Sequence, residues 1–369
     1  MSFKDVYRNR RVLVTGHTGF KGAWLCMWLR ALGAEVVGYA LAPPSEPSIF
    51  VAAGLEDRLI HVNGDVRDME GLLDVFNRYR PEFVFHLAAQ ALVRPSYDDP
   101  KTTFDVNVGG TVNVLDAIRQ TGGVRALVNV TSDKCYENRE WLWGYRENDP
   151  MGGHDPYSAS KGCAELVFAA YLRSFFQRPP NGIRGLGAAS CRAGNVVGGG
   201  DWGRDRLLPD CVRALKGNGV IQIRNPRAIR PWQHVLEPLA GYLWLGAILS
   251  EAPETFSGAW NFGPPNESSL SVAELVERFI RAWGGGEWRD ISDPGAVHEA
   301  VALRLCCDKA ASQLNWRSVL GIEETLALTA AWYRAFYDGC RQHDIHALCV
   351  DQIRHYERLA VRSELSWAL

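Results

Sequence analysis

The chain has 369 residues, of which 47% are hydrophobic and 22% are charged, and its formal net charge at pH 7 is −2. This near neutrality argues against a polyanion-binding surface, so we expect no nucleic-acid partner. The longest apolar stretches, such as residues 236–249, are short and interrupted by Glu237, Pro238 and Gly241, and no signal segment is visible. We therefore expect a cytoplasmic protein with no membrane association, long enough for two lobes.

A glycine-rich turn, TGHTGFKG, occupies residues 15–22. The apolar residues 11–14 before it predict a buried strand of a parallel sheet, and residues 23–32 after it predict a helix that stops at Gly33. This arrangement is typical of a dinucleotide-binding unit, in which glycines let backbone N–H groups and the helix N-terminus approach a pyrophosphate. The candidate cofactor residues here are Gly16, His17, Thr18, Gly19, Phe20, Lys21 and Gly22.

The second predicted strand, residues 35–39, departs from the usual pattern at its end. Such units place an Asp or Glu there for the adenosine ribose, whereas this chain has Tyr39, Ala40 and Leu41. Lys21 could reach a 2′-phosphate or be an ordinary solvated lysine. The end of the second strand therefore does not decide whether the cofactor is NAD or NADP.

Strands and helices continue to alternate through the first 190 residues or so. Further strands are predicted at residues 59–62, 83–87, 125–130 and 187–191, and helices at 69–80 and 100–120. This alternation predicts an α/β fold with a doubly wound parallel sheet and a smaller C-terminal substrate-binding lobe. We assign residues 1–190, with a returning segment near 230–262, to the dinucleotide-binding domain, and residues 191–229 and 263–369 to the lobe.

Residues just beyond the strands are further candidates, because ligands bind at the carboxyl edge of an open α/β sheet. Asp65 is positioned to meet the adenine, and the small residues after the fourth strand would allow close approach of a cofactor, although they equally suit close helix packing. The candidate cofactor residues of this group are Asp65, Val66, Leu87, Ala88, Ala89 and Asn107.

Tyr157 and Lys161 lie four residues apart in a segment that begins like a helix, with Asp155 as cap and Pro156 in the first position. Both side chains therefore share one helix face. A phenol has an ordinary pKa near ~10, so it acts as a base at neutral pH only where positive charge favours the phenolate. Lys161 and an oxidised nicotinamide would supply that charge.

The fifth strand ends in a hydroxyl, a carboxyl and an amine in succession: Ser132, Asp133 and Lys134. Asp133 and Lys134 could be a simple surface salt pair. Together with the Tyr157 and Lys161 helix at the same sheet edge, they instead favour acid–base catalysis. Nine scattered cysteines without a C-x-x-C pair predict no metal site.

On the glycine turn and the Tyr-x-x-x-Lys pair, the chain resembles the extended short-chain dehydrogenase/reductases, the NAD-dependent epimerase/dehydratase family. Asp133 and Lys134 are adjacent acid and base groups that follow the hydroxyl residue Ser132. In this respect the chain resembles the nucleotide-sugar 4,6-dehydratases of that family. Lys134 as the third residue of this cluster, together with residues 199–206 and 230–235, resembles the family's enzymes that act on CDP-glucose. The choice of cytosine rests on this resemblance alone.

The resemblance implies an NAD-dependent lyase that oxidises C4 of CDP-glucose, removes water across C5 and C6 and returns the hydride to C6, in deoxysugar biosynthesis of the kind that serves lipopolysaccharide O-antigen. It implies Tyr157 as the base at the 4-hydroxyl, Lys134 as the base at C5 and Asp133 as the acid at the departing hydroxyl. Ser132 would hydrogen-bond the 4-hydroxyl. The resemblance also implies a homodimer or homotetramer. The implied substrate-binding residues are Ser132, Asn195, Arg204, Arg230 and Arg304.

Three other functions stay open on the sequence. A sugar-nucleotide 4-epimerase would not need Asp133 and Lys134. A 4,6-dehydratase for another nucleotide sugar would use the same groups. A non-catalytic NAD(P)-binding regulator would not need Tyr157 and Lys161.

Overall fold

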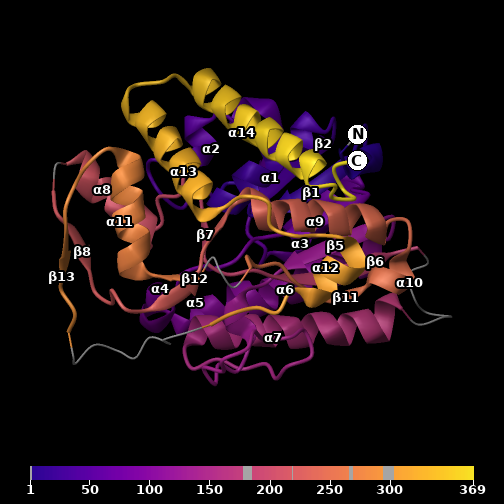
Figure 1. Cartoon of the computed structure of the whole chain (residues 1–369). Coiled ribbons are helices and arrows are strands. Elements are labelled where there is room, and N and C mark those ends of the chain that lie inside the picture. Colours follow the sequence, from indigo (N-terminus) through magenta and orange to yellow (C-terminus); the bar gives the residue numbers. More distant parts are fainter. Residues whose placement is uncertain (1, 178–184, 218, 266–268, 294–302) are drawn as a thin grey trace.

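The computed structural model describes residues 2–177, 185–217, 219–265, 269–293 and 303–369 (Figure 1). At its centre is a seven-stranded sheet in the order β11-β6-β5-β4-β1-β2-β3. All six neighbouring pairs run parallel. The strands are β1 (Arg11–Thr15), β2 (Glu35–Ala40), β3 (Ile60–Asn63), β4 (Phe83–His86), β5 (Ala126–Val130), β6 (Gly187–Arg192) and β11 (Gly258–Asn261). Because the strand order reverses between β1 and β4, the predicted doubly wound sheet is confirmed.

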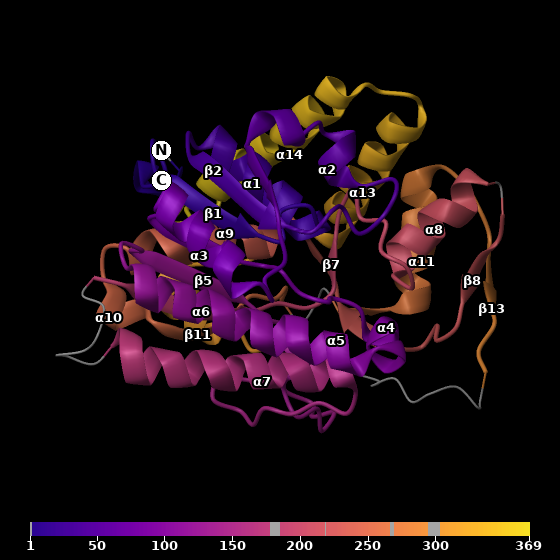
Figure 2. The ribbon, with the colours of Figure 1, turned by 180° about the vertical axis from the view of Figure 1, so that it is seen from behind.

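Helices cover both faces of the sheet because successive strand residues point to opposite sides. Val12 and Val14 pack with α1 and α9 on one face, whereas Leu13 packs with α3, α6 and α7 on the other. Figure 2 shows α3, α6 and α7 side by side. The longer helices are α1 (Phe20–Ala31), α3 (Met69–Tyr79), α6 (Gly110–Thr121), α7 (Pro156–Tyr171), α8 (Leu207–Lys216), α9 (Leu236–Leu249), α11 (Val272–Trp283), α13 (Ile322–Tyr337) and α14 (Gln342–Arg362).

Shorter elements connect these helices and strands. The short helices are η1 (Ser2–Asp5), α2 (Ile49–Ala52), η2 (Glu56–Arg58), α4 (Val93–Asp98), α5 (Pro100–Phe104), η3 (Asp105–Gly109), η4 (Asp133–Cys135), η5 (Leu172–Phe176), α10 (Pro253–Phe256) and α12 (Asp308–Leu314). Three two-stranded sheets pair β7 (Val196–Val197) with β10 (Gln233–His234), β8 (Ile221–Ile223) with β13 (Trp288–Asp290), and β9 (Ile229–Pro231) with β12 (Ser269–Ser271).

Two helices differ in detail from the sequence expectation. α1 begins at Phe20, so the last residues of the glycine turn belong to its first turn. The helix expected over residues 100–120 is confirmed as one continuous helical stretch made of α5, η3 and α6, in which η3 is a π-helical turn. Asn107 lies in that turn and hydrogen-bonds the backbone of Gln90 and the side chain of Ser160. Turns of this kind are frequent at functional sites.

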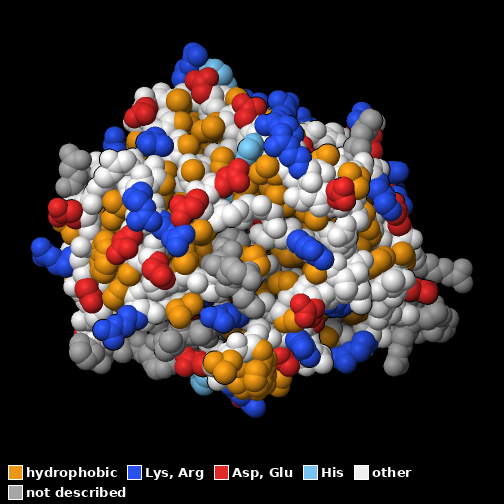
Figure 3. Space-filling view, in the orientation of Figure 1, with side chains coloured by type: hydrophobic (Ala, Val, Ile, Leu, Met, Phe, Trp, Pro, Cys, Tyr) orange, Lys and Arg blue, Asp and Glu red, His pale blue; other side chains and the backbone are white. Residues whose placement is uncertain are grey.

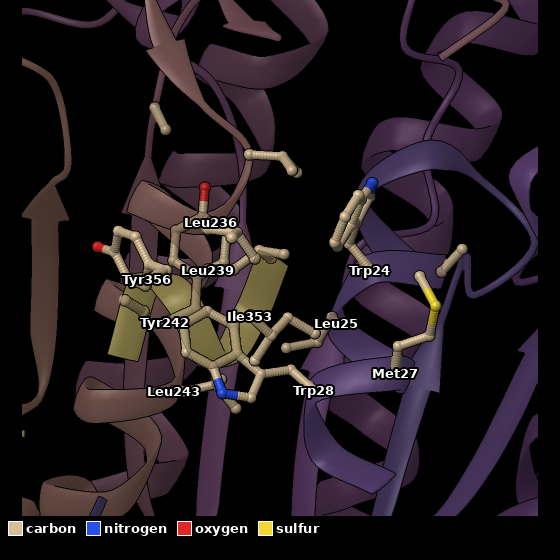
Figure 4. Packing of buried hydrophobic residues seen from close by; sticks show 14 of the residues in the cluster. Trp24, Leu25, Met27, Trp28, Leu236, Leu239, Tyr242, Leu243, Ile353 and Tyr356 are labelled. Atoms are coloured by element: carbon tan, nitrogen blue, oxygen red, sulfur yellow. The ribbon is translucent and has the colours of Figure 1, made fainter. Parts of the chain in front are cut away.

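The smaller lobe lies beside the carboxyl edge of the sheet and includes α8, α11, β8 and β13 (Figure 1). The last helix, α14, does not stay with these elements but packs across α1 and α13. Trp28 of α1 packs with Ile353 and Tyr356 of α14 and with Leu243 of α9 in the main core (Figure 4). The boundaries that we assigned to the two domains stay a prediction.

Charged side chains of both signs are spread over the face shown in Figure 3, with a hydrophobic cluster below α7. No helix in the described part of the chain is long and apolar enough to cross a membrane.

Candidate active site

The glycine turn is held tightly against the end of β4. Gly16 has a φ of +75°, and a β-carbon there would lie 2.7 Å from the backbone nitrogen of Ala88. A β-carbon on Gly22 would lie 2.2 Å from the carbonyl oxygen of Gly16. α1 starts at its N-cap Gly19 with no side chain accepting from its first N–H groups. This cradle fits a dinucleotide, because these N–H groups and the positive end of the helix suit a pyrophosphate.

The His17 side chain points into the protein rather than towards the open side of the turn. Its ring lies against Gly38, where a β-carbon would come within 2.3 Å of it. Its Nε2 lies 2.7 Å from His61 Nδ1. Burial, with His61 nearby, lowers the pKa of His17 to about 3, so the ring is neutral. Only the backbone of His17 remains available to a cofactor.

The other predicted cofactor residues occupy the ends of β3 and β4 or the turn η3. The Asp65 carboxylate accepts from the backbone and guanidinium of Arg67. Val66 is buried against Gly110. Leu87, Ala88 and Ala89 are half-buried directly after β4. Asn107 is buried and tied to Gln90 and Ser160, so it holds the loop after β4 against α7.

α7 places Tyr157 and Lys161 at the carboxyl end of β5. The helix begins as predicted, with the Asp155 carboxylate accepting from the N–H of Ser158 at 2.9 Å and Pro156 in the first turn. Burial raises the pKa of the Tyr157 phenol to about 12, and the nearby Ser132 hydroxyl opposes this shift. Lys161 Nζ donates to the carbonyl of Val130 at 3.5 Å. Burial lowers the pKa of Lys161 to about 8.

The short helix η4 carries the remaining catalytic candidates beside Tyr157. Ser132 Oγ accepts from the N–H of Lys134 at 3.3 Å and donates to Asp133 Oδ1 at 3.1 Å. Asp133 is 3% exposed and lies against Gly194. Lys134 is half-buried. The Ser132 hydroxyl and the Asp133 carboxyl thus lie near the phenol. Because Asp133 is buried and, among the residues that the structure describes, makes no ion pair with Lys134, the alternative of a simple surface salt pair is excluded.

Two further cations lie near Tyr157. Burial lowers the pKa of Lys21 to about 8, and its charge interacts with Arg206, Asp133 and Lys161. Arg206 pairs with Asp201 at 2.9 Å and interacts electrostatically with Tyr157. Arg204, the arginine of this segment that we expect from the sequence to bind substrate, is exposed instead. Two arginines separated by one residue give no sequence signal that selects the inward one.

The remaining predicted substrate residues lie on the lobe or at its junction with the sheet. Asn195 follows β6 in a left-handed conformation, with a φ of +34°, and its carbonyl accepts from the N–H of Gln233. Arg230 lies on β9 and is half-buried. Arg304 lines a cavity of about 530 Å³ together with Arg227, Ser269 and Trp288. The structure thus places Arg304, but not Arg204, at this cavity.

Buried polar atoms in this cavity lack partners in the described part of the chain. Arg304 Nε and Ser269 Oγ are both inaccessible to solvent and make no hydrogen bond there. Such atoms are uncommon in native interiors and favour a polar ligand. Among the described residues, no group of three or more histidine, cysteine or carboxylate side chains is placed to hold a metal ion.

One residue in this region went unnoticed in the sequence. Glu165 follows Lys161 by four residues, as Lys161 follows Tyr157, and it is buried under the site. The repeated spacing of four was a usable signal, because it places all three side chains on one helix face.

Known proteins share this fold and arrangement. Residues 12–256 match the NAD dependent epimerase/dehydratase family. The chain is 49% identical over 336 residues to CDP-glucose 4,6-dehydratase of Salmonella typhimurium, covering 91% of this chain and 94% of the relative. UDP-glucose 4-epimerase of Thermus thermophilus, solved with NAD, matches with a TM-score of 0.72 at 27% identity, covering 88% of this chain and 99% of the other.

A third comparison concerns the fold alone. The dTDP-glucose 4,6-dehydratase of Streptomyces venezuelae, solved with NAD bound, gives a TM-score of 0.74 at 24% identity and covers 88% of this chain and 97% of the other. The family match covers well over half of the chain and includes the glycine turn, the η4 cluster and the Tyr157 and Lys161 helix. The chain belongs to the NAD dependent epimerase/dehydratase family.

Proposed function

We propose that the protein is a 4,6-dehydratase that converts CDP-glucose to CDP-4-keto-6-deoxyglucose with NAD as its cofactor. The observation that carries this proposal is the placement of Ser132 and Asp133 near Tyr157, with Lys134 next to them on η4. A dehydration needs a second acid–base pair besides the phenol, and this cluster supplies it. The 49% identity to a CDP-glucose 4,6-dehydratase over nearly the whole chain supports the substrate.

Each protein group has a definite task in this proposal. The glycine turn and the N-terminus of α1 would hold NAD, and the bound cofactor would supply the hydride acceptor for C4 and the hydride donor for C6. Tyr157 takes the proton of the 4-hydroxyl, and the cationic Lys161 beside it favours the phenolate. Ser132 hydrogen-bonds the same sugar oxygen. Lys134 removes the proton at C5, which the 4-ketone has made acidic, and returns it to C5 when the hydride is added at C6. Asp133 protonates the departing C6 hydroxyl.

The lobe binds the nucleotide in this proposal. Arginine pairs well with a diphosphate because its planar guanidinium donates two parallel hydrogen bonds. Arg304 in the cavity and Arg230 on β9 are the groups that we assign to the diphosphate, with Arg206 closer to the sugar. The unpartnered Arg304 Nε and Ser269 Oγ support a polar ligand here.

We further propose a homodimer or homotetramer. Several large apolar side chains are exposed along α4, α5, α7 and the following turn, on the surface where two subunits could pair. They are Tyr97 (52% exposed), Phe104 (36%), Leu166 (60%) and Phe175 (38%). The molar mass of the purified protein by light scattering tests this directly.

The function is tested by incubating the protein and NAD with CDP-glucose and, separately, with dTDP-glucose, UDP-glucose and GDP-mannose. We expect loss of one water from CDP-glucose and an alkali-absorbing 4-keto product, with the other sugars unchanged. An isomerised sugar of unchanged mass would indicate a 4-epimerase, and dehydration of another nucleotide sugar would correct the base preference. Lys134→Ala is the matched variant, which should lose dehydration while still binding NAD and CDP-glucose.

A further inference from the structure

A buried carboxylate lies one helical turn beyond the candidate catalytic lysine. Tyr157, Lys161 and Glu165 follow one another at intervals of four residues on α7 and share the face that meets the sheet. Glu165 is 3% exposed. Burying an ionised side chain is unfavourable unless close partners compensate the lost hydration, so its partners indicate why it is there.

Both oxygens of this carboxylate are held by the ends of two neighbouring strands. Thr131 Oγ1, directly after β5, donates to Oε1. Ser190 Oγ and Arg192 Nη2, both on β6, donate to Oε2 at 2.8 Å each. Although burial opposes the charge, Arg192 and these hydrogen bonds hold the pKa of Glu165 below its ordinary value. Glu165 is therefore ionised at neutral pH.

Arg192 is itself fixed by a network that continues below the site. Its Nη1 donates to the Tyr136 hydroxyl at 2.7 Å and to the carbonyl of Glu147 at 2.9 Å. The Tyr136 hydroxyl in turn donates to Asn261 on β11. Arg192 also directly precedes the segment against which Asp133 packs. The carboxylate is thus anchored to the same strand ends that carry the catalytic groups.

We propose that Glu165 is a positioning residue for catalysis, which through Thr131 fixes the turn that carries Ser132 and places a fixed negative charge one helical turn beyond Lys161. The catalytic role in this proposal rests on the proposed function, whereas the hydrogen bonds of Glu165 do not depend on it. A carboxylate that only stabilised the fold, through its buried pair with Arg192, could be replaced without changing the pKa of Lys161, even where the loss of one partner destabilises the protein.

The charges around Lys161 give this proposal a measurable consequence. Burial lowers the pKa of Lys161 to about 8, and Glu165 on the same helix is the main group that opposes this, followed by Cys135 on η4. On the remaining sides Lys161 faces His86 of β4, which burial keeps neutral, and the cationic Lys21 of α1. Without the Glu165 charge, Lys161 should lose its proton at a lower pH and no longer favour the Tyr157 phenolate.

Direct titration of Lys161 tests this without any substrate. The chain has few lysines, so a spectrum of the full chain labelled with ε-¹³C lysine is simple, and Lys161→Arg assigns the signal of interest. The lysines are Lys4, Lys21, Lys101, Lys134, Lys161, Lys216 and Lys309. We expect Glu165→Gln to lower the titration midpoint of Lys161 by about one pH unit or more. The variant and the wild type are compared in the same cofactor state.

Glu237→Gln is the matched control, because it neutralises an equally buried carboxylate on α9 that contacts Tyr356 and the loop before α13. It should leave the Lys161 midpoint unchanged. An unchanged midpoint in Glu165→Gln would overturn the proposal. Should that variant not fold, Glu165→Asp keeps the charge but withdraws it from β5, and a smaller shift in the same direction is then expected.

Kinetics supply the second readout. For Glu165→Gln we expect the alkaline limb of the kcat–pH profile to move down by the same amount as the Lys161 midpoint. At pH values above both midpoints, kcat should therefore fall about tenfold for each pH unit of that shift. KM for the nucleotide sugar should not change. An unshifted limb in an otherwise active protein contradicts the positioning role. If wild type dehydrates no nucleotide sugar, the proposed function fails, while the Lys161 titration still decides the role of Glu165.

Discussion

A β-carbon placed on Gly194 would lie 1.9 Å from Oδ2 of Asp133. The candidate acid of the site is thus positioned by the absence of a side chain on the neighbouring segment. Gly194→Ala should push the Asp133 carboxyl out of place and lower kcat by about a hundredfold, within the usual range for loss of an acid–base group. Formation of the 4-keto product measures this. Gly321→Ala, at a glycine with no atom within 4 Å of the added carbon, should retain wild-type activity.

Tyr157→Phe removes the phenol hydroxyl near Ser132 and leaves the aromatic ring in place. We expect kcat to fall by about 10²- to 10⁴-fold with KM little changed, because the 4-hydroxyl loses its base but not its binding pocket. Steady-state kinetics separate the two parameters. Tyr97→Phe, on the exposed α4, is the matched control. Near-normal turnover in Tyr157→Phe would remove Tyr157 from the mechanism.

Gly22→Ala should abolish cofactor binding because the added carbon would lie 2.2 Å from the Gly16 carbonyl oxygen and displace the glycine turn. We expect NADH affinity, measured by fluorescence titration, to fall by at least about a hundredfold, since the turn supplies the pyrophosphate donors. Gly217→Ala at the end of α8, where the nearest atom is 3.6 Å away, serves as the control. Undiminished NADH binding in Gly22→Ala would contradict the assigned cradle.

Arg304→Ala should raise KM for the nucleotide sugar by about 10- to 100-fold and leave kcat nearly unchanged, because a diphosphate contact contributes to binding rather than to the chemical step. Arg289→Ala is a suitable comparison, since Arg289 lies on the neighbouring β13 but is exposed. If both variants behaved alike, the cavity lined by Arg304 would not be the nucleotide site.

Burial raises the pKa of Glu237 from 4.5 to about 7, despite hydrogen bonds from Leu320, Tyr356 and Val319. The folded state therefore holds this proton more tightly than the unfolded chain, so the group stabilises fully below pH 4.5 and this stabilisation is lost as the pH rises through 7. The shift corresponds to about 3 kcal/mol between pH 4.5 and 8. Glu237→Gln should remove this difference in urea unfolding at the two pH values, whereas the exposed Glu277→Gln should preserve it.

The parts of the site that follow from local sequence were predictable. The glycine turn and the spacing of Tyr157 and Lys161 each lie within one strand–turn–helix or helix segment, so their geometry follows from the period of the element. The doubly wound sheet followed from alternation of elements. The π-helical turn η3 did not follow, because Asn107 within it bonds to Gln90, seventeen residues earlier in the chain.

Contacts between distant segments could not be predicted from the sequence. The ion pair of Glu165 with Arg192 joins a helix to a strand 27 residues later, and no pattern in either segment indicates this pairing. Likewise, Asp133 looks like a surface residue until Ala193 and Gly194 are seen to cover it. The choice of Arg206 over Arg204 depends on how the loop before α8 turns, and Asp201 decides this only in the folded protein.

The outer face of α1, the helix that follows the glycine cradle, is covered by the far end of the chain. The indole nitrogen of Trp28 donates to Glu357, 329 residues away, and the Phe3 ring stacks on Trp367. The nucleotide-binding unit therefore cannot complete its core from the first half of the sequence alone. During synthesis an emerging α1 must keep its tryptophan-lined face exposed or shielded by a chaperone until α14 arrives, and a fragment that stops after β6 should aggregate rather than bind cofactor.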